Sequence, residues 1–153
     1  MTTHKSDAVT AGIMPDFAQA GVVLNRSAEF TTADDSIVSG DTIQMVPVPN
    51  DCKILGVQVY YSALPAGVTG CDVGYGGDTD AFMATVPMTG ANIKSAYMGQ
   101  TAGYQNVAGF LYTFTADDTI DIAITSAPTK IPTSQKLSMT VWYKMTGTLS
   151  DET

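Results

Sequence analysis

Paired aspartates are the side chains in this chain whose type and spacing best suit acid–base chemistry. They stand at Asp34-Asp35, at Asp78 and Asp80, and at Asp117-Asp118. Glycosidases use two carboxyl groups about 5 to 10 Å apart, so each pair is a candidate for that reaction. Each pair also falls in a predicted turn, where an exposed carboxylate accepts hydrogen bonds from free backbone N–H groups and keeps an ordinary pKa. We therefore expect these aspartates to cap turns rather than to catalyse a reaction.

Nucleophilic and zinc chemistry lack the residues that they need. The one histidine, His4, lies in an N-terminal stretch without periodicity, so a Ser-His-Asp or Cys-His system would have an unanchored base. Cys52 and Cys71 are too far apart in the sequence for a Cys-x-x-Cys redox pair or a zinc knuckle, and one histidine adds too few ligands. We expect a protein that is not an enzyme, with no catalytic residue, no cofactor and no transition metal.

The glycine-rich segment from 74 to 80 is the remaining candidate for a ligand site. Its glycines do not form the Gly-x-Gly-x-x-Gly pattern of dinucleotide-binding loops, and no helix of useful length follows them. Gly76-Gly77-Asp78-Thr79-Asp80 has the oxygen-rich composition of a calcium loop, but the EF-hand spacing and its bidentate glutamate are absent. The pattern excludes the usual nucleotide loop and leaves calcium binding at the aspartate-rich turns open.

Charge argues against two further classes of partner. The formal net charge is −8 and the seven Lys and Arg residues are scattered, so no basic cluster could neutralise a row of phosphates. An acidic surface repels anionic lipid, and no apolar run approaches the roughly 20 residues that span a bilayer. The N-terminus also lacks the apolar core of a secretory signal. We expect synthesis in a cytoplasm and no binding to nucleic acid or membrane.

Short strands between turns must position these residues. The stretch from 54 to 80 is predicted to be a hairpin, in which strands 54–61 and 71–75 meet through a turn at Leu64-Pro65-Ala66-Gly67. Alternation along the first strand predicts the core face of the hairpin, formed by Leu55, Val57, Val59 and Tyr61.

This hairpin has consequences for its flanking residues. Asp78 and Asp80 would cap a short helical turn at 81–83. Cys71 would face Tyr61 or Ser62, far from Cys52. We therefore expect no disulfide between the two cysteines.

Alternation and turn residues indicate the other elements. A strand is predicted over 42–46, and Pro47 and Pro49 end it or confine it to a sheet edge. Further strands are predicted over the ranges 110–114, 120–125 and 137–145. Residues 86–107 alternate neither as a strand nor convincingly as a helix, although 92–98 would allow one or two helical turns. They are predicted to be a long loop, either a contact surface or a cover for one end of a barrel.

Together these elements predict an all-β fold, an antiparallel β-sandwich of jelly-roll type with an extended N-terminal arm. At 153 residues one domain has enough chain for a core of its own. We divide the chain into an extended arm at 1–30, a single β-sandwich domain at 31–147 and a flexible acidic tail at 148–153. The arm is either a floppy terminus or a segment that orders against a partner.

A family resemblance is carried by residues 40 to 83. The succession comprises Gly40-Asp41-Thr42-Ile43, Cys52-Lys53-Ile54-Leu55-Gly56-Val57 and Asp72-Val73-Gly74-Tyr75-Gly76-Gly77-Asp78-Thr79-Asp80-Ala81-Phe82-Met83, followed later by Asp118-Thr119-Ile120-Asp121. It resembles small structural proteins of tailed bacteriophages. The resemblance covers about half of the chain and consists of turns and strands rather than a catalytic signature.

The resemblance implies a virion protein, most like a head decoration or cement protein that bridges major capsid subunits. It implies the major capsid protein as partner, a position on the capsid surface, synthesis in the host cytoplasm and a homo-oligomer, dimer or trimer. A low-charge domain with turn-rich loops suits many weak lattice contacts that add through avidity. The arm at 1–30 and the loop at 86–107 are the predicted contact segments.

An alternative function belongs to a different class. Exposed aromatic residues and acidic turns would also suit a carbohydrate-binding or receptor-binding β-sandwich module of a phage tail fibre or secreted protein. The candidate aromatic residues are Tyr60, Tyr75, Tyr97, Tyr104 and Trp142. Most of them alternate with the core pattern or lie beside it, so packing is the competing explanation for each.

Overall fold

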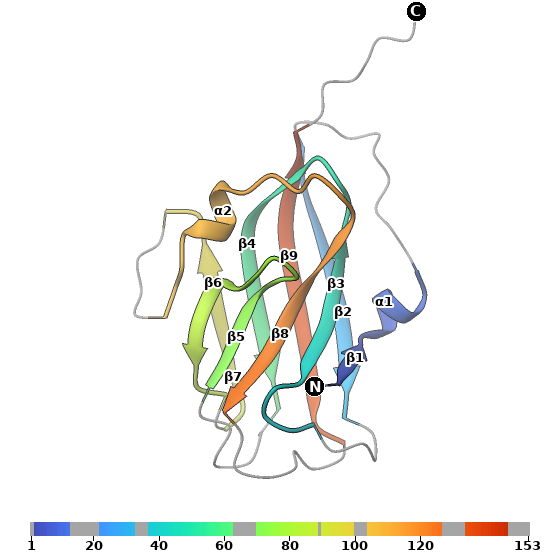
Figure 1. Ribbon diagram of the computed structural model, residues 1–153, viewed down its shortest axis with the longest axis vertical. Helices are drawn as coiled ribbons and strands as arrows, with labels where there is room; N and C mark the ends of the chain where they lie inside the picture. The colour runs from blue at the N-terminus through green and yellow to red at the C-terminus, as the bar shows by residue number, and fades with distance from the viewer. Residues whose placement is uncertain are drawn as a thin grey trace, which may run out of the picture.

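The computed structural model describes residues 2–12, 22–32, 37–62, 70–88, 90–99, 104–126 and 134–146. Within these residues the chain forms nine strands and two short helices (Figure 1). The strands are β1 Thr3–Lys5, β2 Val23–Thr31, β3 Thr42–Val48, β4 Cys52–Tyr61, β5 Gly70–Tyr75, β6 Asp78–Val86, β7 Asn92–Tyr97, β8 Asp118–Ser126 and β9 Lys136–Met145. The helices are α1 Asp7–Thr10 and α2 Ala108–Leu111.

The strands form a jelly roll. β2 pairs with β9, β3 with β8, β4 with β7 and β5 with β6, all antiparallel, and this nesting of early strands with late ones defines the topology. One sheet has the order β1-β3-β8-β5-β6 and the other has the order β2-β9-β4-β7. Figure 1 shows the first sheet in front of the second. The all-β sandwich of jelly-roll type predicted from the sequence is confirmed.

Apolar side chains that alternate along the strands fill the space between the sheets. Ile120, Ile122 and Ile124 of β8 are buried in one core cluster with residues of the opposite sheet. The buried residues of β9 in that cluster are Leu137, Met139, Val141, Tyr143 and Met145. Because successive side chains of a strand point to opposite faces, strict alternation of long apolar residues is sufficient to identify both strands. The strands predicted at 120–125 and 137–145 are confirmed.

The predicted hairpin at 54–80 is wrong in its pairing. β4 pairs with β9 and β7, whereas β5 pairs with β8 and β6, so the two strands belong to opposite sheets. Cys71 lies opposite Ile124 instead of Tyr61 or Ser62. Local alternation identifies each strand, but the partner of a strand depends on segments far away in the sequence. The predicted turn at 64–67 lies outside the described residues.

The predicted core face of β4 is largely correct. Three of its four residues are fully buried, namely Val57, Val59 and Tyr61. Leu55 is only half-buried, and its neighbour Ile54 is buried instead. The register of β4 against β9 shifts between Ile54 and Gly56, and this β-bulge reverses the alternation at the start of the strand.

Residues 78–86 form β6, so the predicted helical turn at 81–83 is wrong. Gly76 and Gly77 connect β5 to β6, and Tyr75 pairs with Asp78 across this turn. The predicted N-cap role of the aspartates is wrong for the same reason, since a strand rather than a helix follows Asp78. The segment 81–83 is fully buried in the core.

The aromatic alternation at 110–114 does not mark a strand. Phe110 belongs to α2, and Phe114 lies beyond it in irregular chain, yet both side chains are buried. The ring of Phe110 packs edge-on against the ring of Phe82 at 5.2 Å. Tertiary packing of individual aromatic rings therefore accounts for the alternation.

The region predicted as an extended arm contributes strands to both sheets. β1 pairs in parallel with residues 42–44 of β3, and β2 pairs with β9 along its nine residues. The 13–21 part of that region and the predicted tail at 148–153 lie outside the described residues. β2 therefore belongs to the sandwich itself.

The predictions for residues 86–107 and for Pro47 concern strands at the edges of the sheets. Residues 92–97 form β7, which pairs with β4, so neither a continuous loop over 86–107 nor a helix at 92–98 is correct. Pro47 lies inside β3 rather than after it. β1 reaches only the 42–44 end of β3, so at Pro47 that strand has β8 as its one paired neighbour among the described residues, as expected for proline at an edge.

Candidate functional site

The single histidine takes part in an anchor for the N-terminal strand. Nε2 of His4 lies 3.4 Å from Oδ2 of Asp41, whose carboxylate also accepts the backbone N–H groups of Thr2 at 2.8 Å and Val38 at 3.1 Å. Burial by itself raises the pKa of Asp41, but these hydrogen bonds and the histidine outweigh it and lower that pKa below its ordinary value. Apart from the His4 ring, the groups that this carboxylate contacts are backbone N–H groups, so the pair has a structural role.

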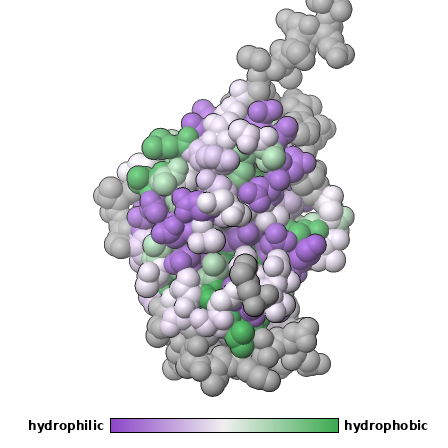
Figure 2. Space-filling model, viewed as in Figure 1, coloured by the Kyte–Doolittle hydropathy of each residue, from purple (hydrophilic) through white to green (hydrophobic). Residues whose placement is uncertain are grey.

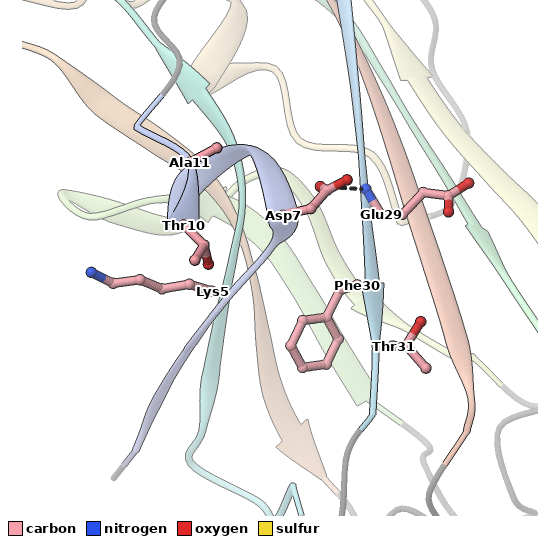
Figure 3. Close-up of a pocket in the computed structure, with 7 residues that line it drawn as sticks. All are labelled: Lys5, Asp7, Thr10, Ala11, Glu29, Phe30 and Thr31. Carbon is pink, nitrogen blue, oxygen red and sulfur yellow. Dashed lines mark hydrogen bonds between the residues drawn. The ribbon is translucent and has the colours of Figure 1, made fainter.

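Helix α1 borders an open groove at the edge of the sandwich. The groove has a volume of about 610 Å³ and lies between α1 and β2 (Figure 3). The side chain of Asp7 accepts the backbone N–H of Glu29 at 3.1 Å, which closes one hydrogen-bonding position on the outer edge of β2. Figure 3 shows the ring of Phe30 at the floor of this groove, between β1 and β2. The groove offers a polar rim around one aromatic ring.

The aspartates of the turns bind backbone groups, as the sequence predicts for a structural role. Asp117 accepts the N–H of Asn50 at 2.9 Å, and Asp118 accepts the N–H of Thr119 at 2.8 Å. The ordinary pKa expected for these aspartates is wrong for Asp78, because burial raises its pKa, and the hydrogen bond and the charge of Asp80 act in the same direction. Asp34 and Asp35 lie outside the described residues.

The structure places one buried carboxyl that sequence reasoning missed. Asp121, on the outer side of β8, is 8% exposed, and its Oδ1 has no hydrogen-bond partner. Burial raises its pKa to about 7, and the charge of Asp118 acts in the same direction. It sits between isoleucines at 120 and 122, and no sequence signal distinguishes it from an ordinary exposed strand position.

Both cysteines are free and fully buried. Cys52 lies in β4 and Cys71 in β5, so they belong to opposite sheets. Burial raises the pKa of each thiol to about 12. The prediction that they form no disulfide is confirmed.

Two of the five candidate aromatic residues, Tyr75 and Tyr104, pack against other side chains of the chain. Tyr75 stacks on Tyr112 at 4.8 Å between ring centroids, and Phe114 packs edge-on against both rings at 5.1 Å. Nζ of Lys94 lies 5.3 Å from the ring centroid of Tyr104. These contacts account for Tyr75 and Tyr104 without a ligand.

The other three candidate aromatics lie together on the outer face of the four-stranded sheet. Gly56 of β4 pairs with Tyr97 on one side and with Trp142 on the other, and the two rings are 5.5 Å apart. A Cβ atom at Gly56 would collide with the ring of Tyr97, so glycine is needed there to seat this ring. Tyr60 lies on the same face further along β4 and is 43% exposed. Gly56 is the residue that sequence reasoning missed here.

A separate apolar patch surrounds helix α2. It consists of Val107, Leu111 and Tyr112, which are 54%, 73% and 37% exposed. Figure 2 shows apolar surface gathered at the upper left, over the position of α2 in Figure 1. Contiguous exposed apolar side chains often mark contacts with another protein, so this patch is a candidate interface.

Two further kinds of feature do not occur among the described residues. Across the described ranges, no three His, Cys, Asp or Glu side chains come together in a way that would hold a metal ion. In the same ranges, no helix has the length and hydropathy that crossing a membrane requires.

Comparison with known proteins identifies the fold. No protein-family model matches the sequence, and no curated protein matches it in sequence. A chain in the capsid of Ralstonia phage GP4 superposes with a TM-score of 0.74 at 17% identity, over 95% of this chain and 99% of that chain. A chain of the cyanophage Pam1 capsid asymmetric unit gives a TM-score of 0.56 at 16% identity, over 84% of this chain and 89% of that one.

A third similar structure is a chain of the acid-stable capsid of Helicobacter pylori bacteriophage KHP30. Its TM-score is 0.53 at 15% identity, over 84% of this chain and 91% of that chain. At identities this low the likeness establishes a shared fold and nothing further. The jelly roll described above is therefore a fold that also occurs in three phage capsids.

Proposed function

We propose that this chain is a non-enzymatic structural protein of a phage virion, a decoration or cement protein that sits on the capsid surface. In this role it bridges major capsid subunits and stabilises the head lattice, as a dimer or trimer made in the host cytoplasm. The observation that carries the proposal is the fold match that spans 95% of this chain and 99% of a chain in the capsid of Ralstonia phage GP4. Because almost nothing of either chain is left over, the two have the same extent as well as the same topology.

The placement of polar chemistry supports a structural role. The histidine contacts the structural carboxylate of Asp41, Asp117 and Asp118 accept backbone N–H groups, and both thiols are buried. A protein that binds a repeating lattice gains affinity from many weak contacts at once, so it has no need of one deep site.

We infer that the patch of Val107, Leu111 and Tyr112 makes one of the lattice contacts. It joins the end of the predicted contact segment 86–107 to α2, and Leu111 is the most exposed large apolar side chain among the described residues. An apolar centre surrounded by polar surface is typical of the middle of a protein interface. Segments 1–30 and 86–107 remain the proposed contact segments. Within 86–107, we assign the contact to the C-terminal end, at Val107.

Purified particles test the proposal directly. The protein is added to capsids that lack it, and co-sedimentation and capsid melting temperature are measured. We expect binding at a fixed ratio to the major coat subunit and a higher melting temperature of the particle. The proposal would be refuted if the protein, added in molar excess over the major coat subunit, did not bind capsids of its own phage.

A pair of variants tests the patch. Leu111→Glu is expected to weaken capsid binding at least about tenfold, because it places a charge in an apolar contact. Val38→Glu is the matched control, since Val38 is also an exposed apolar residue, at 41%, but belongs to a different surface. Equal binding by both variants and the unmodified protein would remove the patch from the interface.

A further inference from the structure

We propose that the outer face of the four-stranded sheet binds a neutral polysaccharide. The face is built from the outward residues of β7, β4 and β9, and it is independent of the α2 patch, which lies on another part of the molecule. It goes beyond the lattice role, because the contacts proposed for that role do not use this face.

The strand registers align the face into three rows. Gly56 lies between Tyr97 and Trp142, Gln58 lies between Ser95 and Thr140, and Tyr60 lies between Ile93 and Ser138. The first and third rows carry the aromatic rings. The middle row carries a hydroxyl, an amide and a second hydroxyl. The rings are separated by four residues along β4, which is roughly 13 Å at the rise of a strand.

Exposure fits a face that is open to a ligand. Tyr60 is 43% exposed and Ile93 is 53% exposed, while the inward residues of the same strands, Val57 and Val59, are fully buried. Tyr97 and Trp142 are half-buried, so each is held in place by its neighbours and still presents part of its ring. Rings fixed in this way lose little entropy when a ligand stacks on them.

The arrangement is also fixed by specific contacts. The ring of Tyr97 lies over Gly56, and Nε2 of Gln58 donates a hydrogen bond to the hydroxyl of Tyr97 at 3.5 Å. In the adjacent strand, Oγ1 of Thr140 lies 2.7 Å from Oγ of Ser27. These links hold the amide and hydroxyl groups of the middle row at defined positions.

The chemistry of the face suits a neutral sugar polymer. None of the nine positions in the three rows carries a charge, although the chain as a whole has a net charge of −8. The C–H faces of pyranose rings pack on aromatic rings, and sugar hydroxyls exchange hydrogen bonds with amides and hydroxyls, which both donate and accept. An anionic polysaccharide would find no charged partner within the three rows, because the exposed outward lysines of β9, Lys136 and Lys144, lie beyond their two ends. The net charge of −8 also disfavours an anionic polymer.

A protein partner fits this face less well. Protein interfaces have an apolar centre and a polar rim, whereas here the centre, Gln58 with its two hydroxyl neighbours, is polar and the aromatic rings stand at the two ends. Regularly spaced polar groups between two stacking positions match a polymer with a repeating ring and hydroxyl pattern.

Trp142 allows a direct test, because it is the only tryptophan in the chain and lies in the proposed site. Its fluorescence is recorded while the full-length protein is titrated with soluble β-glucan, mannan and galactan, and with heparin as an anionic control. Affinity electrophoresis in gels that contain the same polymers provides a second measurement. We expect at least one neutral polymer to shift the emission and retard the protein, and heparin to do neither.

Variants locate the binding. Tyr60→Ala removes an exposed ring, and we expect it to weaken the neutral-polymer interaction about tenfold without loss of folding. Gln58→Ala is the second variant, and Tyr112→Ala is the control, since Tyr112 is a comparably exposed aromatic residue outside the face. No retardation by any neutral polymer, or an equal loss with Tyr112→Ala, would overturn the proposal.

Capsid binding by Tyr60→Ala separates this proposal from the lattice role. We expect Tyr60→Ala to bind capsids as the unmodified protein does. If Tyr60→Ala instead loses capsid binding and no polymer binds, the face is a protein contact, which overturns the polysaccharide site and leaves the virion role intact. If polymers bind but capsids do not, the lattice role fails and the polysaccharide site stands.

Discussion

The carboxylate of Asp41 accepts the backbone N–H of Thr2 at 2.8 Å, a contact between residues 39 positions apart. On the other side, the backbone N–H of Thr42 donates to the carbonyl of Thr2 at 3.1 Å. Together these bonds start the parallel pairing of β1 with β3. A short strand with only three paired residues therefore depends on one buried side chain for its position.

Removal of this carboxylate should release β1. Asp41→Ala leaves the N–H groups of Thr2 and Val38 without their acceptor, so we expect a loss of about 1 to 3 kcal/mol in the free energy of unfolding. Urea denaturation measures the loss, and hydrogen exchange should become faster at residues 3–5. Glu29→Ala, which removes an exposed carboxylate, is the control and should change little.

The same carboxylate predicts an acid-dependent effect. The folded-state pKa of Asp41 is lowered from its ordinary value of 3.8, so its contribution to stability is present above about pH 4 and is lost as the pH falls through the folded-state value. The stability difference between the unmodified protein and Asp41→Ala should thus shrink below pH 4. A difference that stays constant down to pH 2 would contradict the role given to this group.

Sequence reasoning identified the elements whose residues alternate strictly. β8 and β9 carry long apolar side chains at every second position, and no other local pattern fits them. β2 also alternates, but Arg26 interrupts its inward series of Leu24, Ala28 and Phe30. β7 has Asn92, Lys94 and Ala96 at its inward positions, so it lacks an apolar stripe altogether. Edge strands bury little surface, and their sequences are correspondingly weak predictors.

Pairing was less predictable than strand content. The turn residues at 64–67 favour a hairpin between the flanking strands, but the jelly roll places these strands in different sheets. The choice is made by β8 and β9, which lie more than 40 residues away and each pair with one of the two strands. Local turn chemistry carries no information about that competition.

The candidate polysaccharide face was visible in the sequence only as its separate aromatics. Tyr60, Tyr97 and Trp142 stand on three strands, and the register that aligns them depends on a β-bulge between Ile54 and Gly56. A shift of one residue in β4 would turn Tyr60 inward. The residue types are therefore readable in advance, whereas their common face is a property of the assembled sheet.

Gly74 should be the least replaceable glycine of the β5–β6 hairpin. A Cβ atom there would collide with the backbone of Asp78 and Thr79, whereas a Cβ at Gly76 would lie 3.5 Å from Oδ1 of Asp118. We expect Gly74→Ala to cost about 1 to 3 kcal/mol, as overpacking does, and Gly76→Ala to change stability by less than about 1 kcal/mol. Thermal unfolding of the two variants compares them, and equal melting temperatures would argue against the close approach at Gly74.

The cysteines should be inert in the folded protein. Both thiols are fully buried, and burial raises the pKa of each to about 12, so almost no thiolate is present at pH 8. We expect iodoacetamide to add no label to the native protein and two labels after unfolding in guanidinium. Mass spectrometry of the unreduced protein should also find no disulfide between Cys52 and Cys71. Rapid labelling of the native protein would mean that one sheet opens far more readily than its burial indicates.

Asp121 should make the protein less stable as the solution becomes neutral. The ordinary pKa of an aspartate, 3.8, applies to the unfolded chain, whereas the pKa of Asp121 in the folded protein is about 7 because burial disfavours the carboxylate. A folded-state pKa above the unfolded value gives a contribution to stability that is complete below about pH 4 and is lost as the pH rises to about 7. Asp121→Asn keeps the shape of the side chain without its charge, so the variant should exceed the unmodified protein by about 2 to 4 kcal/mol at pH 8 and by little at pH 4. Urea denaturation at pH 4, 6 and 8 measures this, with Asp80→Asn as the control for a less buried carboxylate. Parallel stability curves for the unmodified protein and Asp121→Asn across this range would show that the buried carboxyl is neutralised in some other way.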